Sequence, residues 1–217
     1  MGHAVADEAC RRGHSVVAAF DRFEDLKANS AKLLEADVAI EFTSPSSAAE
    51  NIKLCVALGM PVVSGTTGWY DDYRQVAAGC KASGGRMLTA TNFSVGMNIM
   101  FAINKRLAQV MCGHDEYKVG IREVHHVHKL DAPSGTAISL CGQIEQCMPG
   151  VDVPIESVRE GEVPGVHTVS YTSEADTITL THEAHGRQGL AQGAVLAAEW
   201  LVSAKPGVYT MNDVLKL

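Results

Sequence analysis

The chain has 217 residues, enough for one large domain or two small ones with a sizeable core. Hydrophobic residues make up 46% and charged residues 20%, which is typical of a folded globular protein. The formal net charge of −7 comes with scattered Lys and Arg, whereas a protein that binds nucleic acid usually carries a basic stripe. We therefore expect no nucleic-acid partner.

Membrane insertion and secretion are not expected either. No apolar run approaches the roughly 18–20 residues needed to cross a bilayer, and the first residues, MGHAVADEACRRGH, include acidic side chains and no apolar block. Six cysteines occur without the CxxC spacing of zinc or redox sites. We expect them to be reduced, mostly buried thiols of a cytoplasmic protein.

Helix-like and strand-like segments alternate over the first 93 residues, with short Gly-rich joints. The pattern predicts helices over 3–12, 48–58 and 70–82. It predicts strands over 14–20, 36–43 and 86–91, and a short strand in MPVVSGTTG from Met60. Such alternation is typical of a parallel sheet with crossover helices.

The second half of the sequence changes character. Helices are predicted over 97–111 and 134–147, with a strand over 118–127 between them; after Pro149, alternating β-rich runs predict antiparallel strands. A final apolar helix over 188–203 precedes a tail, GVYTMNDVL. We predict an α/β fold: a Rossmann-like dinucleotide-binding domain, 1–93 with 188–217, interrupted by an α+β domain, 94–187, for substrate binding and oligomerisation.

The start of the chain lacks part of the expected nucleotide domain. Such a domain opens with a strand, a Gly-rich turn and a helix whose N-terminus holds the pyrophosphate. The chain begins at Met1-Gly2, at the end of that turn, without a first strand of roughly 5–6 residues. We expect the chain to be truncated, because a sheet without that strand would leave its neighbours' backbone groups unpaired.

Loops that could hold a cofactor follow the predicted strands. Asp21-Arg22 lies about 20 residues beyond the expected Gly-rich turn, where an acidic group binds the adenosine ribose and an arginine a 2′-phosphate. Phe42-Thr43, Gly65 to Gly68 and Ala90 to Phe93 lie at the C-terminal ends of three other predicted strands. Because parallel strands end at one edge, these loops together predict a dinucleotide trough. Taken singly, each also fits an exposed ion pair or an ordinary loop.

The segment EVHHVHKLDAPSGTA, Glu123 to Ala137, places three histidines and a lysine before a Pro-Ser-Gly-Thr turn. A fully extended strand would hold His125 and Lys129 roughly 13 Å apart, so a shared reaction centre requires a turn between them. Asp131 with Ala132-Pro133 supplies turn chemistry. A helix is then expected to begin with outward N–H groups that bind a carboxylate, those of Ser134, Gly135 and Thr136.

Two other interpretations of this segment stay open. A metal site would lack a nearby acidic or thiol ligand at a zinc spacing apart from Glu123, and Lys129 would repel a cation, so we expect no metal. A solvated polar loop is the second alternative. The remaining histidines that we considered are interpreted as structural or surface groups, namely His3, His14, His114 and His182.

The same segment resembles the signature of the 4-hydroxy-tetrahydrodipicolinate reductase family, formerly called dihydrodipicolinate reductase, of bacterial and plant lysine biosynthesis. The family pattern E-x-H-H-x-x-K-x-D-A-P-S-G-T-A is matched at every specified position. Further similar blocks occur in the family's order, namely FT-x-P, GTTG, NFSVGMN and REGEVPGVHTV. The resemblance therefore covers nearly the whole chain.

This resemblance implies a role for individual residues. His125 and Lys129 correspond to the residues that handle the proton. Substrate binding is assigned to His126, Ser134, Gly135 and Thr136, with the amides of Gly135 and Thr136 holding the carboxylates. The cofactor positions are Met1, Asp21, Arg22, Phe42, Thr43, Gly65, Thr66, Thr67, Ala90, Thr91, Asn92, Phe93 and Arg187.

The function implied is the NADH- or NADPH-dependent reduction of a small cyclic dicarboxylate, 4-hydroxy-tetrahydrodipicolinate, by a cytoplasmic homotetramer. Asp21 favours NADH and Arg22 favours NADPH, so the two residues leave the choice open. Two alternatives remain: a related NAD(P)-dependent enzyme for another small carboxylate, and a non-catalytic nucleotide-binding regulator. The latter would have no need of a proton donor such as Lys129.

Overall fold

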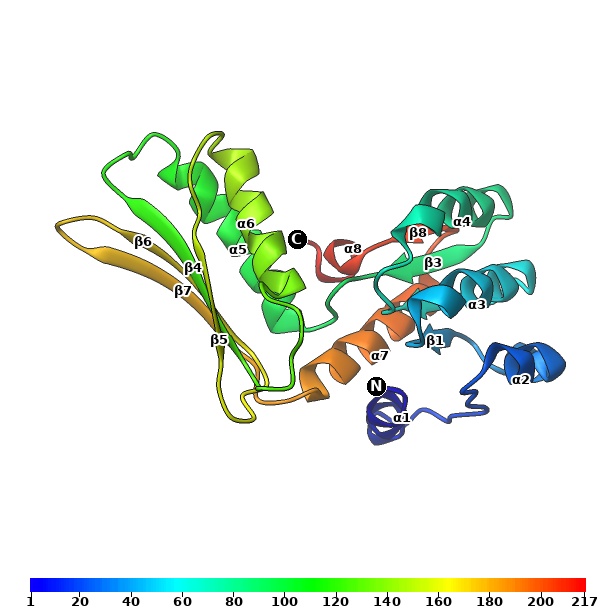
Figure 1. Cartoon of the computed structure of the whole chain (residues 1–217). Coiled ribbons are helices and arrows are strands. Elements are labelled where there is room, and N and C mark those ends of the chain that lie inside the picture. Colours follow the sequence, from blue (N-terminus) through cyan, green and yellow to red (C-terminus); the bar gives the residue numbers. More distant parts are fainter. The chain divides into compact units, whose positions relative to one another are not determined.

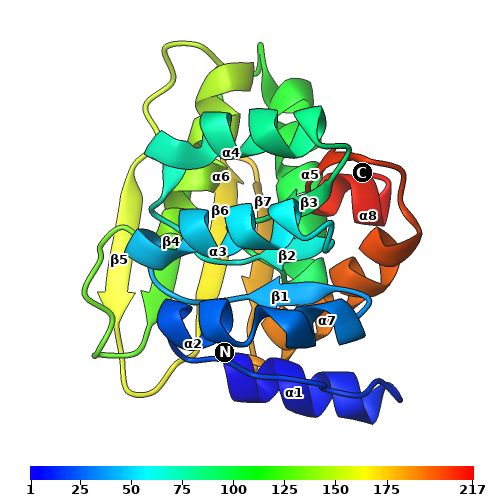
Figure 2. The ribbon, with the colours of Figure 1, turned by 90° about the vertical axis from the view of Figure 1, so that its right-hand side faces the viewer.

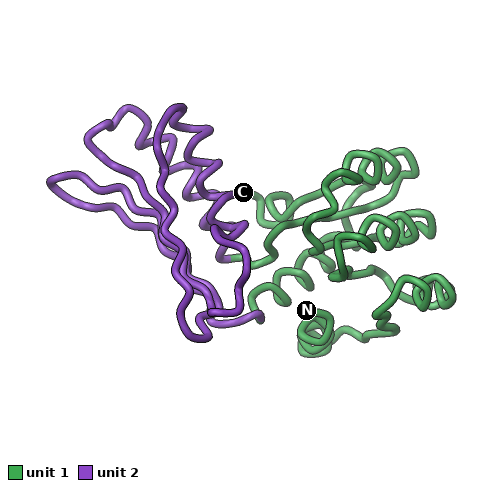
Figure 3. The backbone as a smooth tube through the Cα atoms, in the orientation of Figure 1, with its two compact units in different colours: residues 1–95, 188–217 green, residues 96–187 purple.

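The computed structural model describes residues 1–217 and divides into two compact units (Figure 3). Unit 1 comprises Met1–Val95 and Gln188–Leu217, and unit 2 comprises Gly96–Arg187. None of the helices combines the length and the apolar character that a bilayer crossing demands. The roles predicted for the two domains remain predictions.

Unit 1 is built on a parallel four-stranded sheet in the order β1-β2-β3-β8. Figure 1 labels β1, β3 and β8, and Figure 2 labels β2 between β1 and β3. The strands are short: Ala39–Glu41, Val62–Ser64, Arg86–Thr89 and Gly207–Tyr209. Helix α3 (Pro45–Ala57) connects β1 to β2, and α4 (Tyr70–Ala82) connects β2 to β3. Pro at the first position of α3 suits a helix start, because that residue needs no N–H partner there.

The remaining elements of unit 1 come from both chain ends. Near the N-terminus lie α1 (Gly2–Arg11), α2 (Phe23–Ala28) and the 3-10 helix η1 (Ser30–Glu35); after unit 2 follow α7 (Gln188–Ser203) and α8 (Met211–Leu215). Helix α1 packs against α7, and Glu199 of α7 pairs with Arg12 and His14.

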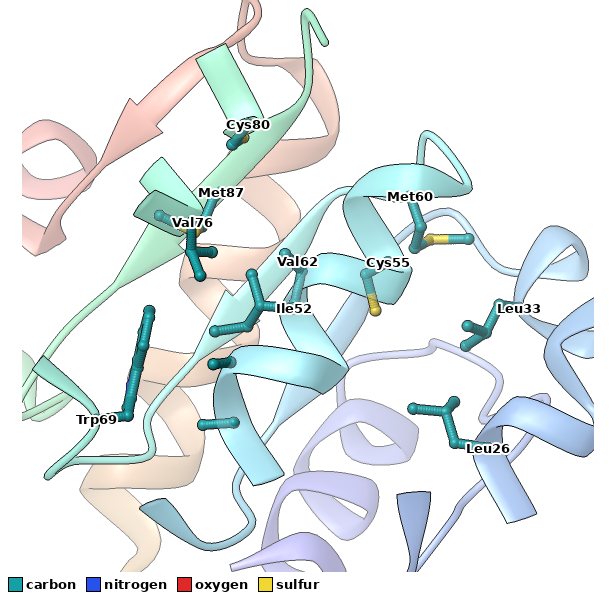
Figure 4. Close-up of a cluster of buried hydrophobic side chains, with 12 residues drawn as sticks. Leu26, Leu33, Ile52, Cys55, Met60, Val62, Trp69, Val76, Cys80 and Met87 are labelled. Carbon is teal, nitrogen blue, oxygen red and sulfur yellow. The ribbon is translucent and has the colours of Figure 1, made fainter. Parts of the chain in front are cut away.

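Alternating side chains of the strands fill two separate cores. Val62 and Met87 lie in the cluster beneath α3 and α4, with Ile52 fully buried among them (Figure 4). Their neighbours Val63 and Leu88 lie in a second cluster with α7 and α1. Figure 2 shows α3 and α4 side by side over the sheet. Helices therefore cover both faces, as a buried parallel sheet requires.

Unit 2 packs two helices on one face of a mixed sheet in the order β5-β4-β6-β7 (Figure 1). The helices are α5 (Val95–Met111) and α6 (Gly135–Cys147); the strands are β4 (Lys118–His125), β5 (Ile155–Arg159), β6 (Val166–Thr172) and β7 (Thr177–Glu183). Leu140 and Ile144 of α6 are fully buried against Ile121 of β4 and Tyr171 of β6.

Several local predictions are wrong. Residues 14–20 form no strand, because no strand lies beside them to complete a ladder, and Val16 and Val17 are exposed. Strand β5 pairs parallel with β4, although β6 and β7 are antiparallel as predicted. The tail forms β8 and α8. All six cysteines are free, but only Cys55 and Cys80 are buried.

Candidate active site

The carboxyl ends of β1 and β2 border a cavity of about 310 Å³ in unit 1. Seven residues line it: Met1, Phe42, Thr43, Pro45, Gly65, Thr66 and Thr67. Six of these, all but Pro45, are predicted cofactor residues. Gly65 is needed for close approach, because a Cβ there would lie 2.0 Å from the Phe42 ring. Parallel sheets of this kind bind ligands at this edge.

A buried carboxylate holds the cavity's rim in place. Glu41, the last residue of β1, is 7% exposed, and its Oε1 accepts hydrogen bonds from Thr43 N (3.0 Å) and Thr66 Oγ1 (2.8 Å). The hydroxyls of Thr43 and Ser64 also donate to it. Thr66 Oγ1 in turn accepts from Thr43 N at 2.8 Å. Glu41 thus ties the loops after β1 and β2 together.

The other predicted cofactor residues do not line this cavity. Asp21 and Arg22 are exposed, and Arg22 pairs with Asp25 at 3.2 Å. In the loop after β3, Ala90 and Asn92 are half-buried and Thr91 is exposed. Phe93 is buried, and its ring meets that of Phe42 edge-on at 5.6 Å. Arg187 is exposed at the end of unit 2.

Helix α7 approaches the Phe93 backbone very closely. A Cβ on Gly193 would lie 1.7 Å from the Phe93 carbonyl oxygen, so only glycine fits at that point of α7. A separate cavity of about 410 Å³ lies between α1 and the start of α7. None of the predicted site residues lines it; its walls are Ala4, Asp7, Glu8, Arg11, Gln188, Ala191 and Gln192.

In unit 2, polar residues continue an apolar stripe of β4. Successive residues of a strand alternate between faces, so Val119, Ile121, Glu123 and His125 share one face. The first two contribute to the core beneath α5 and α6. Glu123 and His125 extend this stripe to the end of β4, and they remain 0% and 8% exposed. The site is therefore an ionisable continuation of the core.

Glu123 lies at the centre of this group. Its Oε2 contacts His125 Nδ1 and accepts from Arg159 Nη1 (3.0 Å), while its Oε1 accepts from Arg159 Nη2 (2.9 Å) and Ser134 N (3.3 Å). Burial opposes the charged carboxylate, but hydrogen bonds from Arg159 and His125 outweigh it and lower the pKa of Glu123 to about 2. The group is ionised at neutral pH.

Two histidines stand side by side next to this carboxylate. The rings of His125 and His167 meet edge-on at 5.0 Å, and His167 Nε2 lies 2.9 Å from Ser134 Oγ. Burial lowers the pKa of His125, against the opposing effect of Glu123. Burial and the neighbouring His125 lower the pKa of His167 to about 4. His167 is therefore neutral under physiological conditions, and its Nδ1 is buried without a partner.

Two backbone N–H groups at the start of α6 donate no hydrogen bond within the protein. Ser134 is the N-cap, and its hydroxyl accepts from Ala137 N at 3.2 Å. Its own N–H donates to Glu123, so the prediction that this amide points outward is wrong. The N–H groups of Gly135 and Thr136 have no acceptor in the structure, and Gly135 is exposed. These two donors can bind an anion.

Lys129 and His126 lie in the turn between β4 and α6. Lys129 Nζ pairs with both carboxylate oxygens of Asp131, at 2.8 and 2.9 Å. Its backbone oxygen accepts from Arg159 Nε, so the turn is fixed to the same arginine that holds Glu123. His126 is half-buried, its Nδ1 has no partner, and its ring lies 6.0 Å from that of His128. The peptide bond between Ala132 and Pro133 is cis.

Sequence reasoning missed four residues that build these sites: Glu41, Glu123, Arg159 and His167. A signal for Glu123 was present, because strand alternation places it on the same face as His125. The contribution of Arg159 depends on the parallel pairing of β5 beside β4, in which Arg159 lies opposite His125. No group of three metal-ligating side chains is assembled in the structure.

Comparison with known families decides the relationship. The family described as "Dihydrodipicolinate reductase, N-terminus" matches residues 1–93, and "Dihydrodipicolinate reductase, C-terminus" matches residues 96–215. The chain belongs to the dihydrodipicolinate reductase family. A 4-hydroxy-tetrahydrodipicolinate reductase of Christiangramia forsetii is 43% identical over 99% of this chain and 93% of that protein. The corresponding reductase of Methanopyrus kandleri is 38% identical over 83% and 72%.

Solved structures confirm the predicted fold class for this member of the dihydrodipicolinate reductase family. A dipicolinate-bound dihydrodipicolinate reductase from Paenisporosarcina sp. TG-14 aligns with a TM-score of 0.73 and 23% identity, over 94% of this chain and 83% of that one. An amine dehydrogenase from Mycobacterium smegmatis aligns with a TM-score of 0.64 and 11% identity, over 96% and 91%. At such identities the likeness concerns the fold.

Proposed function

We propose that the protein reduces 4-hydroxy-tetrahydrodipicolinate to tetrahydrodipicolinate with NADH or NADPH, in diaminopimelate and lysine biosynthesis. The carboxyl ends of the unit 1 strands would bind the cofactor, and the turn between β4 and α6 in unit 2, with the start of α6, would bind the substrate. Family membership and the names of the relatives support this proposal. The Paenisporosarcina reductase, whose fold is similar, has dipicolinate bound, which supports a cyclic dicarboxylate as the class of ligand.

One observation carries the substrate assignment. One carboxylate oxygen of Glu123 contacts Nδ1 of His125. The other accepts a hydrogen bond from the N–H of Ser134, the residue that precedes α6. The proposed proton-handling imidazole and the two free N–H groups of Gly135 and Thr136 are thereby held in one network. A carboxylate bound at those N–H groups would be placed beside an imidazole that can exchange a proton.

The proposed roles follow from the balance of the reaction. Replacing the substrate's hydroxyl group by a hydride consumes one proton and releases water. His125 or Lys129 would supply that proton, because a bound dianion favours the protonated form of each. Gly135, Thr136 and His126 would hold the carboxylates, and Ser134 would keep the helix start in position. The ammonium group of Lys129 now pairs with Asp131, so this contact would have to break before the ammonium group could reach the substrate.

The residues of unit 1 fit a dinucleotide. The N-terminus of α1 begins at Met1, which lines the cavity and provides no side-chain cap, so its first N–H groups are open to a phosphate. The cofactor would supply the hydride. Phe42, Thr43, Gly65, Thr66 and Thr67 would form the adjoining wall. Ala90 to Phe93, Asp21, Arg22 and Arg187 are proposed to contact it beyond the cavity.

The decisive test measures oxidation of NADH and of NADPH by the purified chain with the cyclic substrate. Lys129→Ala should lower kcat about 10²–10⁴-fold, as expected for loss of a proton donor, and leave the Kd for the cofactor unchanged. Lys118→Ala, on the exposed start of β4, is the matched control and should keep full turnover. Cofactor binding without turnover in the wild type would instead support a nucleotide-binding regulator; turnover only with another carboxylate would change the substrate.

We also propose that the protein is a homotetramer in the cytoplasm. Support comes from apolar side chains of α5 that a single chain leaves exposed, Ile99, Ile103 and Val110 at 41%, 47% and 53%. Exposed apolar groups spaced along one helix are typical of a surface that a second copy covers. Light scattering after size-exclusion chromatography measures the mass; a monomer at micromolar concentration would contradict the proposal.

A further inference from the structure

We propose that Glu123 is the positioning residue of His125: its carboxylate keeps a proton on Nδ1 and leaves Nε2 as the nitrogen that exchanges a proton with the substrate. Arg159 fixes the carboxylate for this task. The inference rests on the proposed function, because it takes His125 to be a group that touches the substrate. None of the sequence-based site assignments includes Glu123 or Arg159.

The contacts of Glu123 determine which nitrogen carries the proton. An ionised carboxylate only accepts hydrogen bonds, so His125 Nδ1, which faces Oε2, must be the donor. The carboxylate has little freedom to turn, because Arg159 binds both of its oxygens and Ser134 N binds Oε1. Neutral His125 therefore presents a lone pair at Nε2, and charged His125 presents an N–H there.

The absence of a side chain at Gly165 leaves room at the Nε2 edge of the ring. Gly165 lies against this edge of the ring: a Cβ on residue 165 would be 3.0 Å from Nε2 and 3.2 Å from Cδ2. Its φ of +153° also suits glycine. A larger residue would cover the nitrogen that the proposal makes reactive. On the other side, the edge-on His167 ring limits rotation of His125.

The charged and titratable groups that face His125 fix the sign of the effect. Burial disfavours the imidazolium most and lowers the pKa of His125; Glu123 of β4 favours the imidazolium, and Lys129 and Arg159 disfavour it. His167 of β6 is in ring contact. Removing the negative charge of Glu123 removes the main stabilising influence on the imidazolium, so the pKa of His125 must fall further. In a reaction that needs protonated His125, activity is then lost at a lower pH.

The first test is the pH profile of kcat in Glu123→Gln, with the full chain and the cyclic substrate. The alkaline limb should move to lower pH by about one unit or more, with kcat at neutral pH lowered about 10²-fold or more. Glu162→Gln is the matched control, since Glu162 also contacts a histidine, His128 at 3.1 Å, but both side chains are exposed. Its profile should coincide with that of the wild type.

The second test needs no activity. Nitrogen NMR of labelled protein reports the tautomer: wild-type His125 should carry its proton on Nδ1, and Glu123→Gln should lose this preference. Glu123→Asp should restore part of the wild-type profile. Arg159→Lys, which keeps the charge but not the two-pronged contact, should give an intermediate shift and replaces Glu123→Gln if that variant does not fold.

The outcomes are separable. An unchanged tautomer in the variants, or a loss of kcat that is equal at every pH, would reduce Glu123 to a structural residue and overturn the inference. A wild-type protein with the Nδ1 proton in place but no turnover of the cyclic substrate would overturn the proposed function instead. Equal shifts in Glu123→Gln and Glu162→Gln would also contradict the inference, because the exposed contact between Glu162 and His128 should not affect His125.

Discussion

Each unit places one buried glutamate at the carboxyl end of a strand, yet the two glutamates have different partners. Glu41 closes β1 and accepts hydrogen bonds from neutral groups of Thr43, Ser64 and Thr66. Glu123, two residues before the end of β4, is held by Arg159 and His125. The exposed fractions are similar, 7% and 0%. Burial alone therefore does not determine what such a carboxylate does.

The partners explain the difference. Hydroxyl and amide groups can supply the hydrogen bonds that a buried carboxylate needs and thereby fix the loops that carry them. Because these donors are neutral and do not titrate near neutral pH, they give the carboxylate no part in proton transfer. The second carboxylate instead contacts a guanidinium and an imidazole, so its charge acts directly on a titratable ring, that of His125. The Glu41 group holds the wall of a cavity, whereas the Glu123 group is proposed to set the protonation state of His125.

The largest effect is expected when the cation is removed from the Glu123 group. Arg159→Met leaves a fully buried carboxylate without its main partner, which should lower the free energy of unfolding by about 3–5 kcal/mol. Urea denaturation monitored by circular dichroism measures the loss. The double variant Glu123→Leu/Arg159→Met should be more stable than Arg159→Met, since it removes the buried charge as well. A double variant that is less stable than the single one would contradict this account.

The pH dependence of stability should reveal the second member of this group, His167. Its pKa is lowered from 6.5 to about 4, so the folded state prefers the neutral ring. This preference contributes about 3 kcal/mol to the free energy of unfolding. The contribution is complete above pH 6.5 and is lost as the pH falls through 4. His167→Gln, whose amide can still meet Ser134, should remove this part of the acid sensitivity.

Urea titrations between pH 7 and 4 measure this effect. The window is separate from that of Glu123, whose pKa of about 2 places the loss of its contribution at lower pH, from 4.5 downwards. Parallel curves for the wild type and His167→Gln from pH 7 to 4 would show that His167 does not titrate with unfolding.

Local sequence patterns predicted much of the framework. The spacing of apolar residues placed α4 and α7 at the bounds observed, and the motif from Glu123 to Ala137 indicated the joint between β4 and α6. These features depend on neighbours in the chain. Segment 14–20 shows the limit of such reasoning: its β-type composition is real, but a strand needs a partner, and none pairs with it.

The site was predicted only as far as its short motifs extend. His125 and Lys129 belong to one motif, whereas Arg159 meets Glu123 from 36 residues away on a strand whose parallel pairing was predicted to be antiparallel. Similarly, Thr66 reaches Glu41 across 25 residues. Such contacts depend on strand order and register, which periodicity within one segment does not determine.

The smallest effect is expected in the neutral group of unit 1. Thr66→Val keeps the shape of the side chain but removes its hydrogen bonds with Glu41 and Thr43 N. Thr43 N and Ser64 still donate to Glu41, so the loss in unfolding free energy should be only about 1–2 kcal/mol, measured by urea denaturation. Thr67→Val is the matched control, because Thr67 lines the same cavity but is exposed and donates no hydrogen bond to Glu41. Equal losses in both variants would show that Glu41 does not organise this wall, and a loss as large as that of Arg159→Met would remove the distinction between neutral and charged partners.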